Sequence, residues 1–260
     1  MYQHLRYQQT DAVATITLNR PEAYNALNNA IKLELQDAFQ KIQDDDSVRV
    51  VVLTGQGKAF CSGQDLKAAQ TELKGQAYSE SIRKYYNPLI LAMRQLDKPI
   101  IGRLNGMAVG AGCSLILACD LIVAAEEAYL SELFVGIGLV MDSGSTYFLP
   151  RMVGSQKAFE LATMGTRVSA RDALALGLIN QVVPAEQLDE ATQRYVHYYA
   201  NAPSVAVGLM KKMLNQATQL SLEETLELEA VHQDTAAQTQ DHREGVQAFL
   251  EKRSPTFIGS

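Results

Sequence analysis

Hydrophobic and polar positions along the first part of the chain follow the pattern of an α/β protein. Residues 13–18 alternate between apolar and small polar or β-branched side chains, which predicts a strand. Residues 29–43 carry apolar side chains close to helical spacing. Residues 48–53 are mostly apolar, as is typical of a strand buried on both faces. This order of strand, helix and strand indicates an α/β layered structure.

The same patterns recur through the middle of the chain. Residues 64–95 are predicted to be mainly helical with a break at Pro88, because proline supplies no N–H. Short apolar runs predict strands over residues 98–104, 120–124 and 178–183. Helical spacing predicts helices over residues 113–119, 155–164 and 169–176. Strands and helices therefore continue to alternate up to residue 183.

After Pro184 only helical patterns remain. They predict four helices, over residues 186–199, 204–216, 222–239 and 243–251. The segment Asn201-Ala-Pro203 interrupts them and marks a boundary. We therefore expect a core over residues 1–200 and a helical C-terminal region over residues 201–260.

Composition and charge narrow the class of protein. With 260 residues, 47% of them hydrophobic and 20% charged, the chain suits one large globular domain or a domain with a small appendage. A net charge of −6 argues against an electrostatic nucleic-acid binder. Cys61, Cys113 and Cys119 lack C-x-x-C spacing and are expected to be reduced, as in a cytosolic protein. Neither a signal segment nor a membrane-spanning run is recognised, so we expect a cytoplasmic protein without a membrane partner.

Two glycine-bearing loops are candidates for binding a carbonyl group. Residues 60–66 follow the predicted strand 48–53 after a glycine-rich turn, and this arrangement would leave an N–H near Gln64 free to donate. The alternative is an ordinary loop whose glycine adopts a positive φ. Gly110-Ala-Gly112 places the N–H of Ala111 at the start of a helix, where the alternative is close packing against a strand. Together the two N–H groups would form an oxyanion hole for a thioester enolate.

A lone acid follows in an apolar segment. Asp142 comes directly after the run Phe134–Met141. A carboxyl group in such surroundings resists ionisation and can be tuned for proton transfer. The alternative is a helix cap, since Ser143-Gly-Ser-Thr precedes apolar residues. Asp65, by contrast, is interpreted as the cap of a helix that starts at Leu66.

Several motifs, in the same order along nearly the whole chain, make it similar to the crotonase (enoyl-CoA hydratase/isomerase) superfamily. The motifs are Leu18-Asn-Arg-Pro-Glu22, Asn25-Ala-Leu27, Ala59–Leu66, Lys98-Pro-Ile100, Asn105–Gly112, Cys119–Ala124 and Glu244–Arg253. The resemblance implies a spiral of ββα turns with a helical C-terminal region. It also implies trimers or hexamers, with residues 201–260 serving oligomerisation and covering the active site.

The resemblance further implies roles for individual residues. The oxyanion donors would be the N–H groups of Gln64 and Ala111. Coenzyme A, as part of the substrate, would lie against Ala26, Ser62, Gln64, Asp65, Leu66 and Gly112. Lys252 of a neighbouring subunit would contact a coenzyme A phosphate, with a solvated helix end as the alternative. No separate cofactor and no metal are expected.

The positions of the hydratase acids differ in this chain. Hydratases of the superfamily use two glutamates, and the matching positions here are Ser114 and Phe134, with Glu132 two residues from the second. Serine and phenylalanine cannot carry out two-carboxylate hydration. A subset of relatives has one acid in a Gly-Leu-x-Pro-Asp-x-Gly-Gly-Thr pattern, which matches residues 138–146 and places the acid at Asp142. Met141 replaces the usual proline and Ser145 the second glycine.

We therefore expect an acyl-CoA isomerase in which Asp142 is the acid and base. The expected reaction is a shift of a 3-enoyl to a 2-enoyl double bond, a rearrangement of ring-1,2-epoxyphenylacetyl-CoA to its oxepin form, or both. One alternative is an enoyl-CoA hydratase that uses Asp142 or Glu132. Another is a non-catalytic acyl-CoA-binding subunit, which has no need for an acid in an apolar segment.

Overall fold

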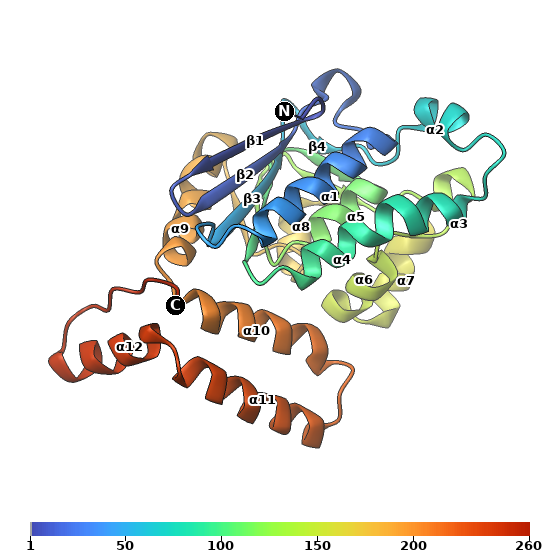
Figure 1. Cartoon of the computed structure of the whole chain (residues 1–260). Coiled ribbons are helices and arrows are strands. Elements are labelled where there is room, and N and C mark those ends of the chain that lie inside the picture. Colours follow the sequence, from blue (N-terminus) through green and yellow to red (C-terminus); the bar gives the residue numbers. More distant parts are fainter. Residues whose placement is uncertain (1) are drawn as a thin grey trace.

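A six-stranded sheet forms the centre of the core (Figure 1). The computed structural model describes residues 2–260. In spatial order the strands are β1 (Leu5–Thr10), β2 (Val13–Leu18), β3 (Val50–Gly55), β5 (Ile100–Leu104), β7 (Leu121–Ala125) and β10 (Gln181–Val183). β1 and β2 form an antiparallel hairpin, and the other neighbours are parallel. Parallel neighbours require crossover connections, and these connections carry the second sheet and the helices.

The second sheet is built from the short strands that follow the long ones. It contains β4 (Ala59–Cys61), β6 (Met107–Val109), β8 (Tyr129–Ser131) and β9 (Val168–Ser169). Each of β3, β5 and β7 is thus followed by a short strand and then by helical structure. This repeat is the expected spiral of ββα turns, so the predicted fold class is confirmed.

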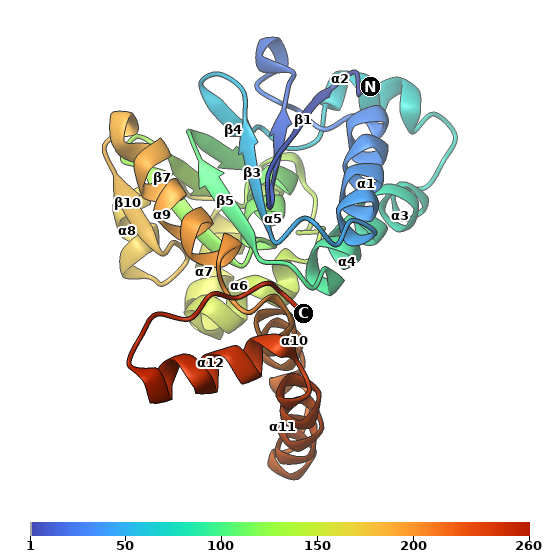
Figure 2. The same ribbon diagram turned by 60° about the vertical axis from the view of Figure 1, so that its left-hand side comes forward.

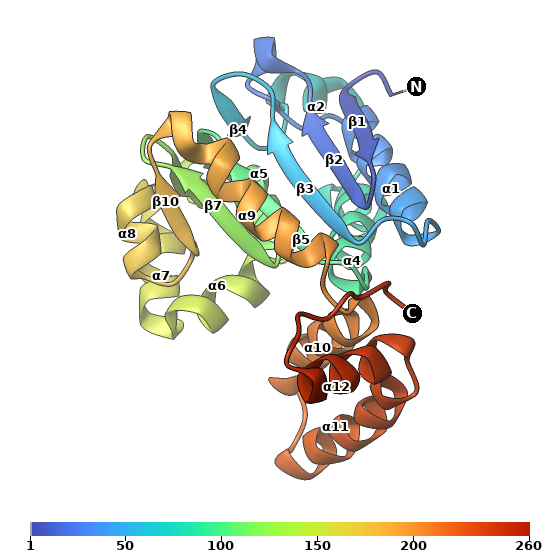
Figure 3. The same cartoon turned by 90° about the vertical axis from the view of Figure 1, so that its left-hand side faces the viewer.

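Helices cover both faces of the large sheet (Figures 2 and 3). The core helices are α1 (Asn29–Gln43), α2 (Leu66–Glu72), α3 (Tyr78–Ser81), α4 (Asn87–Gln95), α5 (Ala111–Leu117), α6 (Ser145–Val153), α7 (Ser155–Met164), α8 (Ala170–Ala175) and α9 (Leu188–Ala200). The larger apolar cluster joins the sheet to α1, α4 and α5. A smaller cluster lies under α9 on the other face, where Val52, Ile101 and Val123 meet Leu188 and Val196.

The predicted break at Pro88 was wrong, and one strand of the core was missed. The chain is continuously helical from α3 to α4 across Pro88, through a π-helical turn over Ile82–Tyr86. Pro88 lies in the first turn of α4, where the π turn already displaces the usual hydrogen bonds, so its missing N–H does not interrupt the helix. The strand β1 was not predicted, because most of its side chains are exposed and the run lacks an apolar pattern.

The C-terminal helices project from the core as an arm (Figures 1 and 3). The arm consists of α10 (Ser204–Ala217), α11 (Leu222–Ala237) and α12 (Gln240–Glu251). Lys211 on α10 anchors it, because its ammonium group pairs with Asp120 at 2.7 Å. α11 buries none of its side chains within this chain. No helix over residues 2–260 has the length and apolar character needed to cross a membrane.

Candidate active site

The two glycine-bearing loops lie side by side. Gly63 has a φ of +91°, and a side-chain carbon there would come within 2.7 Å of the Val109 carbonyl oxygen and 3.4 Å of the Ala111 nitrogen. A carbon added to Gly112 would lie 2.4 Å from the carbonyl oxygen of Cys61. Glycine is therefore required where the loop after β4 passes the start of α5. The close packing considered as the alternative for Gly112 is therefore present. The same packing brings the two loops together, as an oxyanion hole requires.

The N–H groups of Gln64 and Ala111 remain available to a ligand. Neither donates a hydrogen bond to an acceptor within residues 2–260. Main-chain hydrogen bonds fix the residues on either side of Gln64. The Leu27 N–H donates to the Gly63 carbonyl, and the Asp65 N–H donates to the Leu27 carbonyl. Ala111 is the first residue of α5, where helix geometry leaves the N–H without an internal partner. These are the properties required of preorganised oxyanion donors.

A cavity of about 360 Å³ opens at these two donors. Gln64 and Ala111 line one part of it, and Asp142 lines another. The remaining wall is largely apolar, with Leu73, Ile82, Tyr86, Phe134 and Ile137 among the lining residues. The arrangement therefore combines an acyl-sized apolar volume, two free N–H donors and one carboxyl group.

Asp142 is half-buried and faces this cavity. Burial raises the pKa of its carboxyl group, while a hydrogen bond from the Ser143 hydroxyl at 2.8 Å and the charge of Lys32 oppose that shift. The interpretation of Asp142 as a helix cap is wrong. α6 begins at Ser145 with Gly144 in the cap position, and no side chain bonds to its first N–H groups.

Lys32 is a site residue that the sequence analysis missed. Its side chain is completely buried, and its ammonium group donates to Gln64 Oε1 at 3.2 Å. The same oxygen accepts the Tyr86 hydroxyl at 2.5 Å, and the ammonium lies 4.3 Å from the Tyr86 ring centre. Burial lowers the pKa of Lys32 to about 8, against the charges of Glu72 and Asp142. Lys32 and Tyr86 thus hold the Gln64 side chain behind the oxyanion loop.

The two positions that correspond to the hydratase glutamates supply no second carboxyl group to the cavity. Ser114 is fully buried on α5, and Phe134 lines the cavity with its ring. Glu132 is 3% exposed, and its Oε1 lies 2.6 Å from the Ser145 hydroxyl oxygen. Among residues 2–260, Asp142 is therefore the one carboxyl group that lines this cavity.

The residues predicted to bind coenzyme A gather around the loop after β4. Ser62, Gln64 and Leu66 line the cavity. Asp65 caps α2 as predicted, since it accepts the Ala68 N–H at 3.0 Å, and it also pairs with Arg20 at 2.9 Å. Ala26 is buried next to this loop, and Gly112 packs on Cys61. Contact of these residues with coenzyme A stays a prediction.

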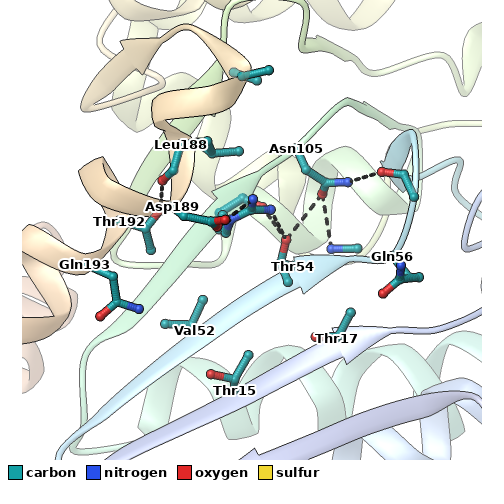
Figure 4. A pocket seen from close by; sticks show the side chains of 15 residues that line it. Thr15, Thr17, Val52, Thr54, Gln56, Asn105, Leu188, Asp189, Thr192 and Gln193 are labelled. Carbon is teal, nitrogen blue, oxygen red and sulfur yellow. Dashed lines mark hydrogen bonds and ion pairs between the residues drawn. The ribbon is translucent and has the colours of Figure 1, made fainter.

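A larger cavity of about 570 Å³ lies elsewhere, between α9 and the face of the large sheet (Figure 4). Threonine side chains of β2 and β3 line it, and its charged groups, Arg103 and Asp189, pair with each other at 2.7 Å. Asn105 bonds to Thr54 and to the main chain of Gly55 and Gly57. None of the predicted site residues lines this cavity.

Comparisons with known proteins identify the family of the chain. The family model for enoyl-CoA hydratase/isomerase matches residues 8–260. The 1,2-epoxyphenylacetyl-CoA isomerase of Escherichia coli is 40% identical over 249 residues, 95% of each chain. A Rhodobacter capsulatus protein named "Probable enoyl-CoA hydratase" is 40% identical over 258 residues, 99% of each chain. The crystal structure of an enoyl-CoA hydratase from Bacillus anthracis superimposes with a TM-score of 0.91 at 36% identity, and the match covers 99% of this chain and 100% of that one.

The chain therefore belongs to the enoyl-CoA hydratase/isomerase family and is an enzyme of the crotonase type. Both isomerase and hydratase names occur among its relatives, so the family alone does not define the reaction. The difference between the two reactions has to come from the site residues.

Proposed function

We propose that the protein is an acyl-CoA isomerase in which Asp142 carries a proton between two carbon atoms of the thioester. The observation that carries the proposal is the composition of the cavity, where one carboxyl group faces two free N–H donors. Ser114 and Glu132 lie outside its lining. The isomerase name of the Escherichia coli relative, 40% identical to this chain, supports the same reaction.

The mechanism uses groups that the chain itself supplies. The N–H groups of Gln64 and Ala111 bind the thioester oxygen and acidify the adjacent C–H bond. Asp142 as a carboxylate removes that proton, and the two donors stabilise the resulting enolate by about 3–4 kcal/mol each. Protonated Asp142 then returns the proton to another carbon, so that no atom is gained or lost.

We propose ring-1,2-epoxyphenylacetyl-CoA and 3-enoyl-CoA thioesters as the substrate classes. With the ring epoxide the proton leaves the α carbon and returns to a ring carbon once the seven-membered oxepin ring has formed. With a 3-enoyl thioester it moves from the α to the γ carbon. The largely apolar wall around Tyr86 and Phe134 suits either acyl group.

Turnover measurements with a small panel of thioesters test the reaction. We expect isomerisation of the ring epoxide or of a 3-enoyl-CoA, with solvent deuterium appearing at the carbon that is protonated. Hydration of crotonyl-CoA at a comparable rate would instead establish the hydratase alternative. Binding of all thioesters without turnover of any would establish the non-catalytic alternative.

We also propose that the protein assembles as a trimer or a pair of trimers. The arm supports this, because Leu214, Leu222, Phe249 and Leu250 are between 70% and 82% exposed in the single chain. No residue of the described segment 201–260 lines the 360 Å³ cavity of the same chain. Any cover over the active site would therefore come from a neighbouring subunit. Sedimentation at micromolar concentration tests the proposal, and a stable monomer would contradict it.

Lys252 is proposed to reach a coenzyme A phosphate across that contact. It lies exposed at the end of α12 with a φ of +56° and forms no ion pair within residues 2–260. Its neighbour Arg253 is engaged with Glu244 and Glu251 at 2.6 and 2.7 Å. We expect Lys252→Ala to raise the KM for the thioester without changing kcat, and an unchanged KM would favour the solvated helix end.

A further inference from the structure

A chain of buried polar side chains leads from Glu132 to the main chain of Asp142. Glu132 follows β8, Ser145 begins α6 and Ser114 lies on α5. Ser145 Oγ lies 2.6 Å from Glu132 Oε1 and 2.7 Å from Ser114 Oγ. Ser114 Oγ lies 3.2 Å from the Asp142 carbonyl oxygen and 3.4 Å from that of Gly110. Three separate segments are therefore joined by this chain, which the proposed reaction does not use.

Counting hydrogens links the direction of the chain to the protonation state of Glu132. The carbonyl groups of Asp142 and Gly110 can only accept, so their contacts with Ser114 are hydrogen bonds when the Ser114 hydroxyl proton points to one of them. Ser114 Oγ must then accept the single proton of Ser145, because two hydroxyl oxygens at 2.7 Å need a proton between them. Ser145 has no second proton to donate to Glu132. The remaining contact is satisfied when Glu132 itself carries a proton and donates it to Ser145.

The second oxygen of Glu132 supports the same assignment. Glu132 is 3% exposed, and its Oε2 has no nitrogen or oxygen donor within residues 2–260, so the only side chain beside it that can donate is the weak donor Cys113. A carboxylate oxygen without a donor is costly in a buried site, whereas the carbonyl oxygen of a neutral acid tolerates it better. Burial accordingly raises the pKa of Glu132 to about 7, although the Ser145 and Cys113 side chains act in the opposite direction.

We propose that Glu132 is a positioning residue whose protonated form donates to Ser145 and, through Ser114, holds the main chain of Asp142 against α5. The proposal rests on the proposed role of Asp142 as the acid and base. The Asp142 carbonyl oxygen also accepts the Ser145 N–H at 3.1 Å, so the two serines together hold this turn. Ser143 within it has a φ of +52°, a strained value for a residue other than glycine, which such contacts stabilise.

Loss of the Glu132 proton reverses the chain. The Ser145 hydroxyl then donates to the carboxylate, Ser114 donates to Ser145, and the Asp142 carbonyl loses its hydroxyl partner. The titratable groups that face Glu132 are the Cys113 thiol on α5 and the Asp142 carboxyl before α6. A second negative charge near Asp142 also opposes ionisation of the catalytic carboxyl. Turnover is therefore expected to decrease as pH rises through the pKa of Glu132.

The pH dependence of kcat in Glu132→Gln tests the proposal. Glu127→Gln is the matched control, because Glu127 is an exposed residue between β7 and β8. Glutamine retains the donor of the neutral acid and cannot ionise. We expect the variant to match the wild type within about twofold at about pH 6 and to exceed it about tenfold at about pH 8. The control is expected to follow the wild type. Identical profiles for Glu132→Gln and the wild type would overturn the proposal.

Ser114→Ala distinguishes the hydrogen-bond chain from simple charge repulsion. This variant keeps Glu132 but removes the last link to Asp142. We expect lower turnover at about pH 6 and a much weaker decrease between about pH 6 and 8. A full wild-type decrease in Ser114→Ala would show that charge alone acts, and would overturn the positioning role.

The protonation of Glu132 has a test that does not depend on activity. In Asp142→Asn, infrared difference spectra across the same pH range report the remaining buried carboxylic acid. We expect its band to disappear near the pKa of Glu132 and to be absent in Asp142→Asn combined with Glu132→Gln. Absence of the band in the single variant overturns this proposal. Full turnover of Asp142→Asn would instead overturn the proposed function.

Discussion

The 570 Å³ cavity beside α9 and the 360 Å³ cavity at the two free N–H groups differ in how their charged groups are paired. In the 570 Å³ cavity beside α9, Arg103 and Asp189 neutralise each other, and Asn105 is fully engaged by Thr54 and neighbouring main chain. In the 360 Å³ cavity, Asp142 has no ion pair within residues 2–260, and two N–H groups have no acceptor. A carboxyl group without an ion pair beside two free N–H donors, rather than volume, therefore distinguishes the site that can act on a substrate.

The carboxyl group of Asp142 distinguishes the 360 Å³ cavity only if turnover requires it. Asp142→Asn keeps the size of the side chain but removes its basicity, so we expect turnover to decrease about 10³-fold with thioester affinity largely kept. Asp189→Asn is the matched control, because it makes the same change in the larger cavity and is expected to leave turnover unchanged. Steady-state kinetics and calorimetry provide both measurements. Near-normal turnover of Asp142→Asn would exclude Asp142 as the acid and base.

Loss of one of the two free N–H donors is expected to cause the next largest decrease in turnover. Ala111→Pro deletes one donor at the first position of α5, a position that tolerates proline, and we expect turnover to decrease about 10²-fold. Ala111→Gly retains the N–H and serves as the control, with turnover expected close to the wild type. Circular dichroism establishes that both variants are folded. Full activity in a folded Ala111→Pro would remove Ala111 from the oxyanion hole.

The positive charge of Lys32 near Asp142 predicts a smaller, pH-dependent effect on kcat/KM. The charge of Lys32 lowers the pKa of Asp142 against the effect of burial. Lys32→Met removes that charge, so the pKa of Asp142 rises and the acid limb of kcat/KM moves to higher pH. At about pH 6 we expect a several-fold loss that diminishes as pH rises. Lys41→Met, an exposed change on the same helix, is the control, and an unmoved acid limb in Lys32→Met would contradict the coupling.

The larger elements of this fold were predictable because their patterns are local. Helix α1 matched its predicted range, since its apolar stripe repeats through Leu35, Phe39 and Ile42. The short strands β4, β6 and β8 were not predicted, because segments of three residues carry too little periodicity and exist through pairing with distant partners. The predicted helix over residues 64–95 missed the loop between α2 and α3, which contains Gly75.

The candidate site was predicted where motifs specify it and missed where packing does. Gln64, Ala111 and Asp142 were assigned from glycine-rich loops and a family pattern, and the structure brings them to one cavity. Lys32 was missed, although a signal existed. It falls three residues before Leu35 on the apolar stripe of α1, where a lysine is unusual. The partnership of Glu132 with Ser145 had no such signal, because it joins segments that only the tertiary fold brings together.

The smallest expected effect concerns the larger cavity itself. Arg103→Gln removes the guanidinium that pairs with Asp189, an acid whose side chain is 83% exposed. Exposed ion pairs contribute between about 0 and 1 kcal/mol, so we expect the free energy of unfolding to change by less than about 1 kcal/mol. Turnover and KM are expected to stay at wild-type values, because no catalytic group lines this cavity. Urea unfolding together with steady-state kinetics makes both measurements on the same preparation. A tenfold loss of turnover in a folded Arg103→Gln would show that the larger cavity takes part in the reaction, and the contrast between paired and unused polar groups would then no longer identify the active site.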